Sequence, residues 1–168
     1  MKIDGSVHER VLVGGQEQYV HNTWPAISDD GQIIALPGQD GANEPLVVLR
    51  RAGAAWTIVR QAATSPGATH HFRPSFSRDG ARILFECSDD VDDTRGHGIC
   101  EVQGDGTAPR RIWPPTPSPT PALVDFFSVS EAPSGDLVFE ANDGAERVFR
   151  WVRNSGALSD AAERHAEQ

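Results

Sequence analysis

A four-residue segment, Ser77-Arg78-Asp79-Gly80, is followed by an apolar stretch, and this arrangement recurs along the chain. Ser and Asp side chains can hydrogen-bond nearby backbone amides, and glycine adopts positive φ without a steric clash. The segment therefore predicts a tight turn between two strands. Ser28-Asp29-Asp30-Gly31 repeats it 49 residues earlier, and Pro133-Ser134-Gly135 is a diverged copy 55 residues later. This period limits the fold to a few repetitive architectures.

Short strands are expected throughout each repeat. The chain has 168 residues with 16 glycines and 12 prolines, and no long stretch shows helical periodicity. The first strand of each repeat carries Pro25, Pro74 or Val129. The second, third and, in two copies, fourth strands are expected at Gln32–Leu36, Pro45–Arg51 and Ala55–Gln61; Ala81–Cys87, Ile99–Gln103 and Arg110–Trp113; and Asp136–Ala141 and Glu146–Arg153.

Four antiparallel strands in about 50 residues are typical of a propeller blade. Ser-x-Asp-Gly, an apolar strand, a polar loop and a second apolar strand together resemble the TolB-type (WD40-like) β-propeller repeat over nearly the whole chain. The resemblance implies an all-β fold with three blades, at about 22–61, 70–113 and 124–153. The third copy departs from the motif. The resemblance implies a fold and no single activity, because such propellers serve as binding scaffolds, peptidase gates and lyases.

The two ends of the chain suggest how the third blade is completed. The segment after Asp4-Gly5 resembles the one after Asp105-Gly106, so Glu9–Val13 is expected to be a fourth strand. Residues 154–168 contain no β-branched residue and are expected to form a polar tail outside a 1–153 domain. With the four strands of a blade lettered A to D, the expected order is D-ABCD-ABCD-ABC.

Three blades are fewer than the four or more of ordinary propellers. A two-fold homodimer would give a six-bladed ring, in which residues 9–13 of each chain complete the third blade of the other. The alternatives are a fragment of a longer propeller protein and a monomeric sandwich-like fold.

Three polar residues fall at equivalent places, each four residues before Pro25, Pro74 or Val129. First strands line the channel of a propeller, so these residues could converge there and bind a divalent transition metal. Some TolB-like propeller lyases hold a metal with channel histidines, which this set loosely resembles; the alternative is that the three residues only hydrogen-bond neighbouring backbone. The set is His21, His70 and Asp125. Phe72, Arg73 and Phe126, on the same strands, are further candidate ligand contacts.

The loop between the second and third strands of the second repeat is strongly acidic. Asp90 and Asp92 have the oxygen ligands and spacing that suit calcium, but Arg95 stands where a calcium loop needs glycine. The alternative is a solvated acidic loop. Cys87 and Cys100 flank this loop and would lie within disulfide range if the strands pair. Free thiols in a reducing cytosol are equally compatible with the sequence, whereas a disulfide would indicate export.

The remaining sequence features narrow the functional classes. A net charge of −9 with only two adjacent arginine pairs argues against nucleic-acid binding. No secretory signal and no membrane-spanning apolar run is present in the sequence, which predicts a soluble cytoplasmic protein; a chain whose signal had been removed would look the same and would be periplasmic or secreted. No nucleophile elbow or phosphate-binding loop occurs. The four tryptophans, at positions 24, 56, 113 and 151, are expected to pack between blades; the alternative is a ligand platform.

These observations favour a non-enzymatic module that binds a small ligand or a protein at the channel mouth or the rim loops. A metal-assisted lyase or hydrolase acting on an acidic sugar-like substrate, with Arg73 neutralising the substrate, is one alternative. A structural fragment of a larger propeller protein is the other.

Overall fold

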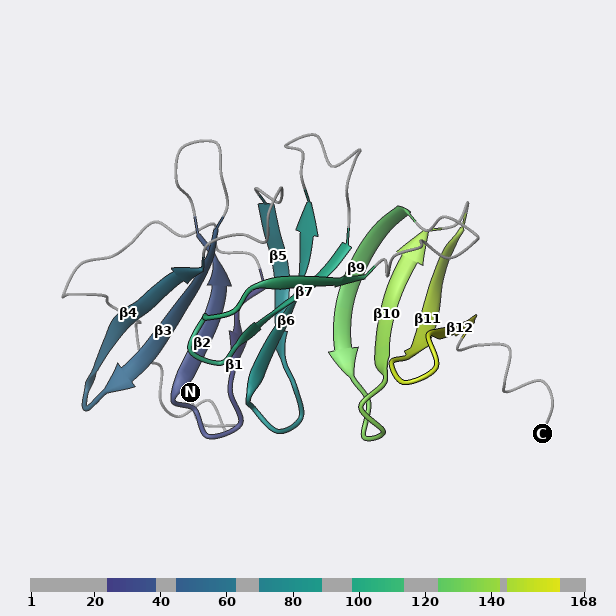
Figure 1. Cartoon of the computed structure of the whole chain (residues 1–168). Coiled ribbons are helices and arrows are strands. Elements are labelled where there is room, and N and C mark those ends of the chain that lie inside the picture. Colours follow the sequence, from purple (N-terminus) through teal and green to yellow (C-terminus); the bar gives the residue numbers. More distant parts are fainter. Residues whose placement is uncertain are drawn as a thin grey trace, which may run out of the picture.

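The computed structural model describes residues 24–38, 45–62, 70–88, 98–113, 124–142 and 145–160. These residues form three antiparallel sheets of four strands each, which we call blades 1, 2 and 3 (Figure 1). Blade 1 consists of β1 (Ala26–Ile27), β2 (Ile33–Pro37), β3 (Leu46–Ala52) and β4 (Ala55–Ala62). Blade 2 consists of β5 (His70–Phe76), β6 (Arg82–Ser88), β7 (Gly98–Gln103) and β8 (Arg110–Trp113). Blade 3 consists of β9 (Val124–Glu131), β10 (Leu137–Asn142), β11 (Glu146–Val152) and β12 (Ala157–Asp160).

The strands of every blade follow one another across the sheet in sequence order. The first strands are the inner ones, because β5 contacts both β1 and β9, whereas β4, β8 and β12 form the opposite edges. The prediction of an all-β chain with three four-stranded antiparallel blades is confirmed. No helix of sufficient length and apolarity to span a bilayer occurs among the residues that the structure describes.

The predicted strand order is wrong at blade 3, which takes its fourth strand from its own C-terminal segment. β12 pairs with β11, with Trp151 opposite Leu158, and thus lies in the segment expected to be a polar tail. The chain reverses after Val152, whose carbonyl accepts a 2.8 Å hydrogen bond from the amide of Gly156 (φ 69°). Leu158 packs against the apolar cluster of blade 3, and this tertiary contact outweighs the low β-propensity of Ala-Leu-Ser-Asp. Residues 9–13, expected in this position, lie outside the described residues.

The repeated turn is held by the side chains that the sequence singled out. The Ser77 hydroxyl donates to Asp79 Oδ1 (2.6 Å) and accepts from the amide of Arg82 (2.9 Å). Asp79 Oδ1 also accepts from the amide of Ala81 at 3.0 Å. Gly80 has φ 69°, which glycine adopts without strain. Ser77 and Asp79 are therefore structural residues of the turn.

The first turn repeats this arrangement and the third departs from it. The Ser28 hydroxyl donates to Asp30 Oδ1 at 2.6 Å and accepts from the amide of Ile33 at 2.9 Å. In the third turn Ala132 replaces the serine, and its amide donates to the carbonyl of Asp136, four residues later. The equivalent bond in the second turn spans five residues, from Ser77 to Arg82. The third turn is thus one residue shorter, which explains its diverged sequence.

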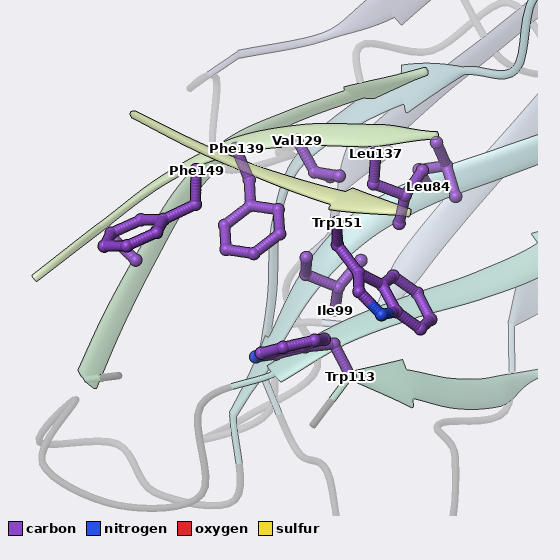
Figure 2. Packing of buried hydrophobic residues seen from close by; sticks show 9 residues of the cluster. Leu84, Ile99, Trp113, Val129, Leu137, Phe139, Phe149 and Trp151 are labelled. Carbon is purple, nitrogen blue, oxygen red and sulfur yellow. The ribbon is translucent and has the colours of Figure 1, made fainter. Parts of the chain in front are cut away.

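Apolar side chains fill both junctions between blades. Blades 1 and 2 meet over Ala35, Leu46, Val48, Ile83, Phe85, Cys87, Cys100 and Val102. Blades 2 and 3 meet over Leu84, Ile99, Trp113, Val129, Leu137, Phe139, Ala141, Phe149 and Trp151 (Figure 2). A third cluster, Ile34, Leu36, Val47, Leu49 and Trp56, lies on the face of blade 1 that points away from blade 2.

The tryptophans do not all pack between blades. Trp113 contacts Phe139 and Trp151 across the junction of blades 2 and 3, with ring centroids 5.6 and 5.2 Å apart. Trp56 is buried on the far face of blade 1. Trp24, just before the inner strand β1, is 52% exposed and stacks on Arg73 of blade 2, so it is not buried in a junction. This exposed indole belongs to the candidate functional site.

Candidate functional site

The residues expected to bind a ligand fall on or beside the inner strands. His70 begins β5, and Asp125 and Phe126 belong to β9, but their side chains lie outside the described part of the structure. His21 lies outside the described residues altogether. The proposed metal set of His21, His70 and Asp125 therefore stays a prediction, and only Phe72 and Arg73 have described side chains.

The acidic loop is a second untested prediction, because Asp90 and Asp92 lie outside the described residues. Within the described ranges, no group of three His, Cys, Asp or Glu side chains is placed to hold a metal ion. At the base of this loop Cys87 and Cys100 are joined as a disulfide, with Cα atoms 5.9 Å apart. They are diagonal neighbours on paired strands, since Cys87 lies opposite Gly98 and Cys100 opposite Phe85.

Arg73 is fixed between two neighbours on different blades. Its Nη1 donates to Glu86 Oε2 at 2.8 Å within blade 2, and the Glu86 residue is only 3% exposed. Its guanidinium carbon lies 4.3 Å from the ring centroid of Trp24, which precedes the inner strand of blade 1. Arg73 is thus a stacked and ion-paired residue, and its expected role of neutralising an acidic substrate stays a prediction.

In each blade, one residue in or just before the inner strand has left-handed backbone geometry. Trp24, Arg73 and Ser128 have φ angles of 60°, 46° and 51°, and they occupy equivalent repeat positions. Pairing shifts register beside Arg73 in β5 and beside Ser128 in β9, as it does at a β-bulge. Such geometry costs about 1–3 kcal/mol for a residue other than glycine, and bulges commonly redirect side chains beside functional sites.

Sequence reasoning missed this feature for a physical reason. Trp24 and Arg73 each precede a proline, and a residue before proline is expected to be extended. The sequence signal for this geometry was the repeat itself, because Trp24 and Arg73 occupy the same repeat position, each just before a proline. The consequence of the left-handed geometry is that the Trp24 indole stacks over the Arg73 guanidinium of blade 2.

The exposed apolar surface of the inner strands lies on blade 1. Trp24 and Ile27 are 52% and 56% exposed, more than any other large apolar residue that the structure describes. The neighbouring inner strands are tied together, because the Ser75 hydroxyl donates to the carbonyl of Val129 at 2.6 Å. The Trp24 indole and the Arg73 guanidinium form a small surface that spans blades 1 and 2, which we call the inner-strand surface. Ile27 points to the opposite face of blade 1, because it pairs with Ile34 of the third cluster.

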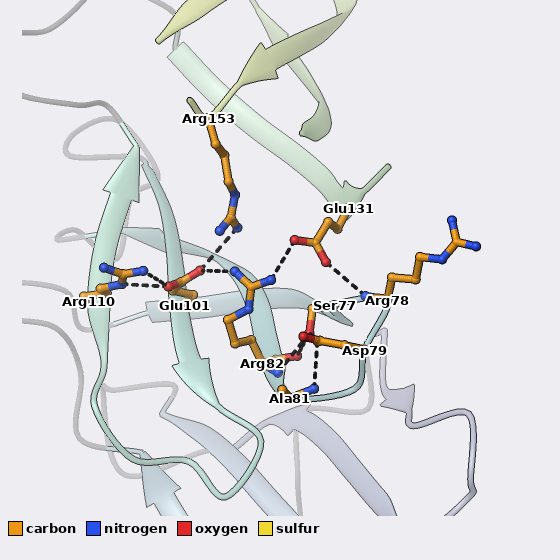
Figure 3. A network of polar contacts seen from close by, with 9 residues as sticks. All are labelled: Ser77, Arg78, Asp79, Ala81, Arg82, Glu101, Arg110, Glu131 and Arg153. Carbon is orange, nitrogen blue, oxygen red and sulfur yellow. Dashed lines mark hydrogen bonds and ion pairs between the residues drawn. The ribbon is translucent and has the colours of Figure 1, made fainter. Parts of the chain in front are cut away.

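The charged residues beside the turns hold the blades together. Glu101, on β7, is buried and accepts from Nε of Arg110 (2.6 Å) and from Nη2 of Arg153 on blade 3 (3.2 Å) (Figure 3). Arg82 of blade 2 pairs with Glu131 of blade 3 at 2.8 Å. These two contacts cross the junction between the blades. They indicate a structural network and not a catalytic one.

The turn carboxylates are also held in their ionised form. Hydrogen bonds from the Ser77 hydroxyl and the Ala81 amide lower the pKa of Asp79 below 3.8. The pKa of Asp136 is lowered mainly by its hydrogen bond with Arg150, and also by the Ser134 hydroxyl. A carboxylate stabilised as an anion is a poor general acid at neutral pH. The lowered pKa values of Asp79 and Asp136 are therefore explained by hydrogen bonds that stabilise the fold.

Comparison with known proteins supports the fold. No family model and no curated protein matches the sequence. Among solved structures, TolB from Acinetobacter baumannii is 18% identical with a TM-score of 0.57, over 82% of this chain and 31% of that one. A putative TolB from Agrobacterium tumefaciens is 20% identical with the same TM-score, over 82% and 47%. The GH74 xyloglucanase from Xanthomonas campestris is 16% identical with a TM-score of 0.50, over 77% and 19%.

The three blades and their inner strands define the chain as a segment of a β-propeller. More particularly, the fold is TolB-like, and the expected resemblance is confirmed at the level of the fold. The chain spans about a third to a half of the TolB structures that it matches.

Proposed function

We propose that this chain is a non-enzymatic binding module that holds a protein partner at the inner-strand surface. The observation that carries the proposal is the exposed Trp24 indole, which is stacked on Arg73. Tryptophan and arginine are the residue types most enriched among the residues that dominate binding energy at protein interfaces.

Rigidity supports the same role. The Trp24 indole is stacked on a guanidinium that is itself ion-paired to buried Glu86. A side chain that is ordered before binding loses less conformational entropy when a partner arrives. A strained backbone persists only where its surroundings hold it, so the left-handed geometry of Trp24 and Arg73 also supports an ordered arrangement.

The test compares retention of partner proteins by the immobilised chain and by three variants. Trp24→Ala should lose a protein that the unaltered chain retains. Ile27→Ser and Val148→Ser each remove an exposed apolar side chain from a different surface and should retain it. Equal retention by all four proteins would contradict the proposal. Far-ultraviolet circular dichroism of each variant checks that the blades remain folded.

The metal-dependent enzyme is the rival proposal. It rests on His21, His70 and Asp125 as ligands, with Arg73 contacting the substrate. Metal analysis of the purified chain and of His70→Ala separates the two proposals. A bound transition metal that is lost with His70 would favour the enzyme, and the absence of bindable metal would remove its chemical basis.

A further inference from the structure

Three turns of the described structure contain an aspartate followed by a glycine. They are Asp30-Gly31, Asp79-Gly80 and Asp105-Gly106. The turns depend on this pair, because the aspartate accepts backbone amide hydrogens and the glycine takes positive φ, at 68°, 69° and 79°. The same pair is also the one most readily isomerised to isoaspartate, because glycine has no side chain to hinder the reaction.

Isomerisation starts when the glycine nitrogen attacks Cγ of the preceding aspartate. A bond forms between the nitrogen and Cγ, the amide proton and a carboxyl oxygen leave as water, and a five-membered succinimide remains. Water then opens the ring, and breaking the bond between the nitrogen and the main-chain carbonyl carbon gives isoaspartate. One water leaves and one enters, so no other reactant is needed. The product has one more carbon in the main chain, which the turn cannot accommodate.

All three carboxylates share a short hydrogen bond from a hydroxyl group. The donors are Ser28 to Asp30 Oδ1, Ser77 to Asp79 Oδ1 and Thr107 to Asp105 Oδ1, each at 2.6 Å. The hydroxyl comes from two residues before the aspartate in the first two turns and from two residues after it in the third. The same contact therefore recurs where the Ser-x-Asp-Gly motif does not.

The attacking nitrogen is held as well. Each of the three glycine amides donates to the main-chain carbonyl three residues earlier, at 2.7–2.8 Å. The nitrogen must lose its proton and turn toward Cγ, so this hydrogen bond has to break. On the other side, Asp79 Oδ1 also accepts from the amide of Ala81 at 3.0 Å (Figure 3). Nitrogen and carboxylate are thus fixed by separate hydrogen bonds, and a reactive approach has to break both sets.

The hydroxyl also keeps the carboxyl group in its less reactive form. A carboxyl oxygen leaves as water far more readily from the protonated acid than from the carboxylate. The Ser28 hydroxyl is the largest cause of the lowered pKa of Asp30, and the Ser77 hydroxyl is the largest cause of the lowered pKa of Asp79. Removing either hydroxyl should therefore release the side chain and raise the fraction that is protonated at neutral pH.

We infer that the hydroxyl groups of Ser28, Ser77 and Thr107 protect the Asp-Gly bonds beside them from isomerisation, in addition to supporting the turns. This gives the serine of the Ser-x-Asp-Gly motif a chemical role that turn geometry alone does not require. The three turns lie apart from the residues of the inner-strand surface, so the inference goes beyond the proposed binding function.

The test measures isoaspartate at each pair in the folded full chain. The unaltered chain, Ser77→Ala, Ser77→Thr and Thr107→Val are incubated at neutral pH, and peptide mapping by mass spectrometry follows the appearance of isoaspartate. Asp30-Gly31 is unaltered in every protein and serves as the reference within the same molecule. The same proteins unfolded in urea give the rate of reaction without the turn.

We expect Ser77→Ala to speed isomerisation at Asp79 about fivefold in the folded chain, the order of magnitude for losing one hydrogen bond, with Asp30 unchanged. Ser77→Thr keeps a hydroxyl and should react like the unaltered chain. Thr107→Val should speed the reaction at Asp105 alone. In urea, where the turn is lost, Ser77→Ala and the unaltered chain should react at Asp79 at the same rate.

An unchanged rate at the neighbouring Asp-Gly pair in either folded variant would overturn the inference. An equal rise at Asp30, Asp79 and Asp105 would assign the effect to lower stability of the whole chain and would also overturn it. Far-ultraviolet circular dichroism checks that each variant is folded. Should Ser77→Ala fail to fold, Thr107→Val decides the question, because the hydrogen bond that it removes lies in an exposed turn.

Discussion

The most informative perturbation of the fold is Glu101→Gln, which removes the charge on which three arginines converge. Glu101 accepts from Nε of Arg110 at 2.6 Å and Nη2 of Arg153 at 3.2 Å, and lies 3.6 Å from Nη1 of Arg82. Removing one partner of a buried ion pair costs about 3–5 kcal/mol. The arginine side chains are 20–66% exposed, so water solvates part of the uncompensated charge, and glutamine retains the shape and one acceptor. We therefore expect a loss of about 2 kcal/mol.

Urea denaturation measures this loss as a shift in midpoint at constant slope. Glu140→Gln, an exposed glutamate on blade 3, is the control and should change the free energy of unfolding by less than about 0.5 kcal/mol. A double-mutant cycle with Arg153→Gln isolates the contact between blades, for which we expect a coupling of about 1 kcal/mol. If Glu101→Gln costs no more than Glu140→Gln, the network does not join the blades.

Three further predictions follow from the turns and the strand edges. Ser128→Gly should raise the free energy of unfolding by about 1 kcal/mol in urea denaturation, because Ser128 is exposed and has φ 51°; a loss would show that its conformation is not strained. Because the pKa of Asp79 is lowered on folding, its contribution is present above pH 3.8 and is lost as pH falls through the folded pKa. Ser77→Ala should raise that pKa in an NMR titration, and an unchanged value would refute the assigned cause. A chain ending at Gly156 should be clearly less stable in urea than one ending at Asp160, because only the first lacks β12; equal midpoints would show that β12 contributes nothing.

Local chemistry made much of the fold predictable. Turns at Ser28 and Ser77 depend on residues within five positions of each other, so the sequence carries the whole signal. The spacing of those turns then set the blade period. Strands β6 and β7 followed from apolar runs bounded by turn residues.

Features that depend on contacts between blades were not predictable in the same way. β12 has weak intrinsic preference for a strand and is held there by β11 and by the packing of Leu158. The left-handed geometry of Trp24 and Arg73 opposes what a following proline predicts, and the guanidinium stacked on the indole comes from a different repeat. The inner-strand surface thus arises from residues 49 positions apart.

Completion of blade 3 by its own chain is the central claim, and nuclear Overhauser contacts between backbone protons test it directly. The account predicts contacts from Trp151 to Leu158 and from Arg150 to Ser159, in the antiparallel register of β11 and β12. Contacts from β11 to residues 9–13 instead, whether in the same chain or in a second copy, would contradict it.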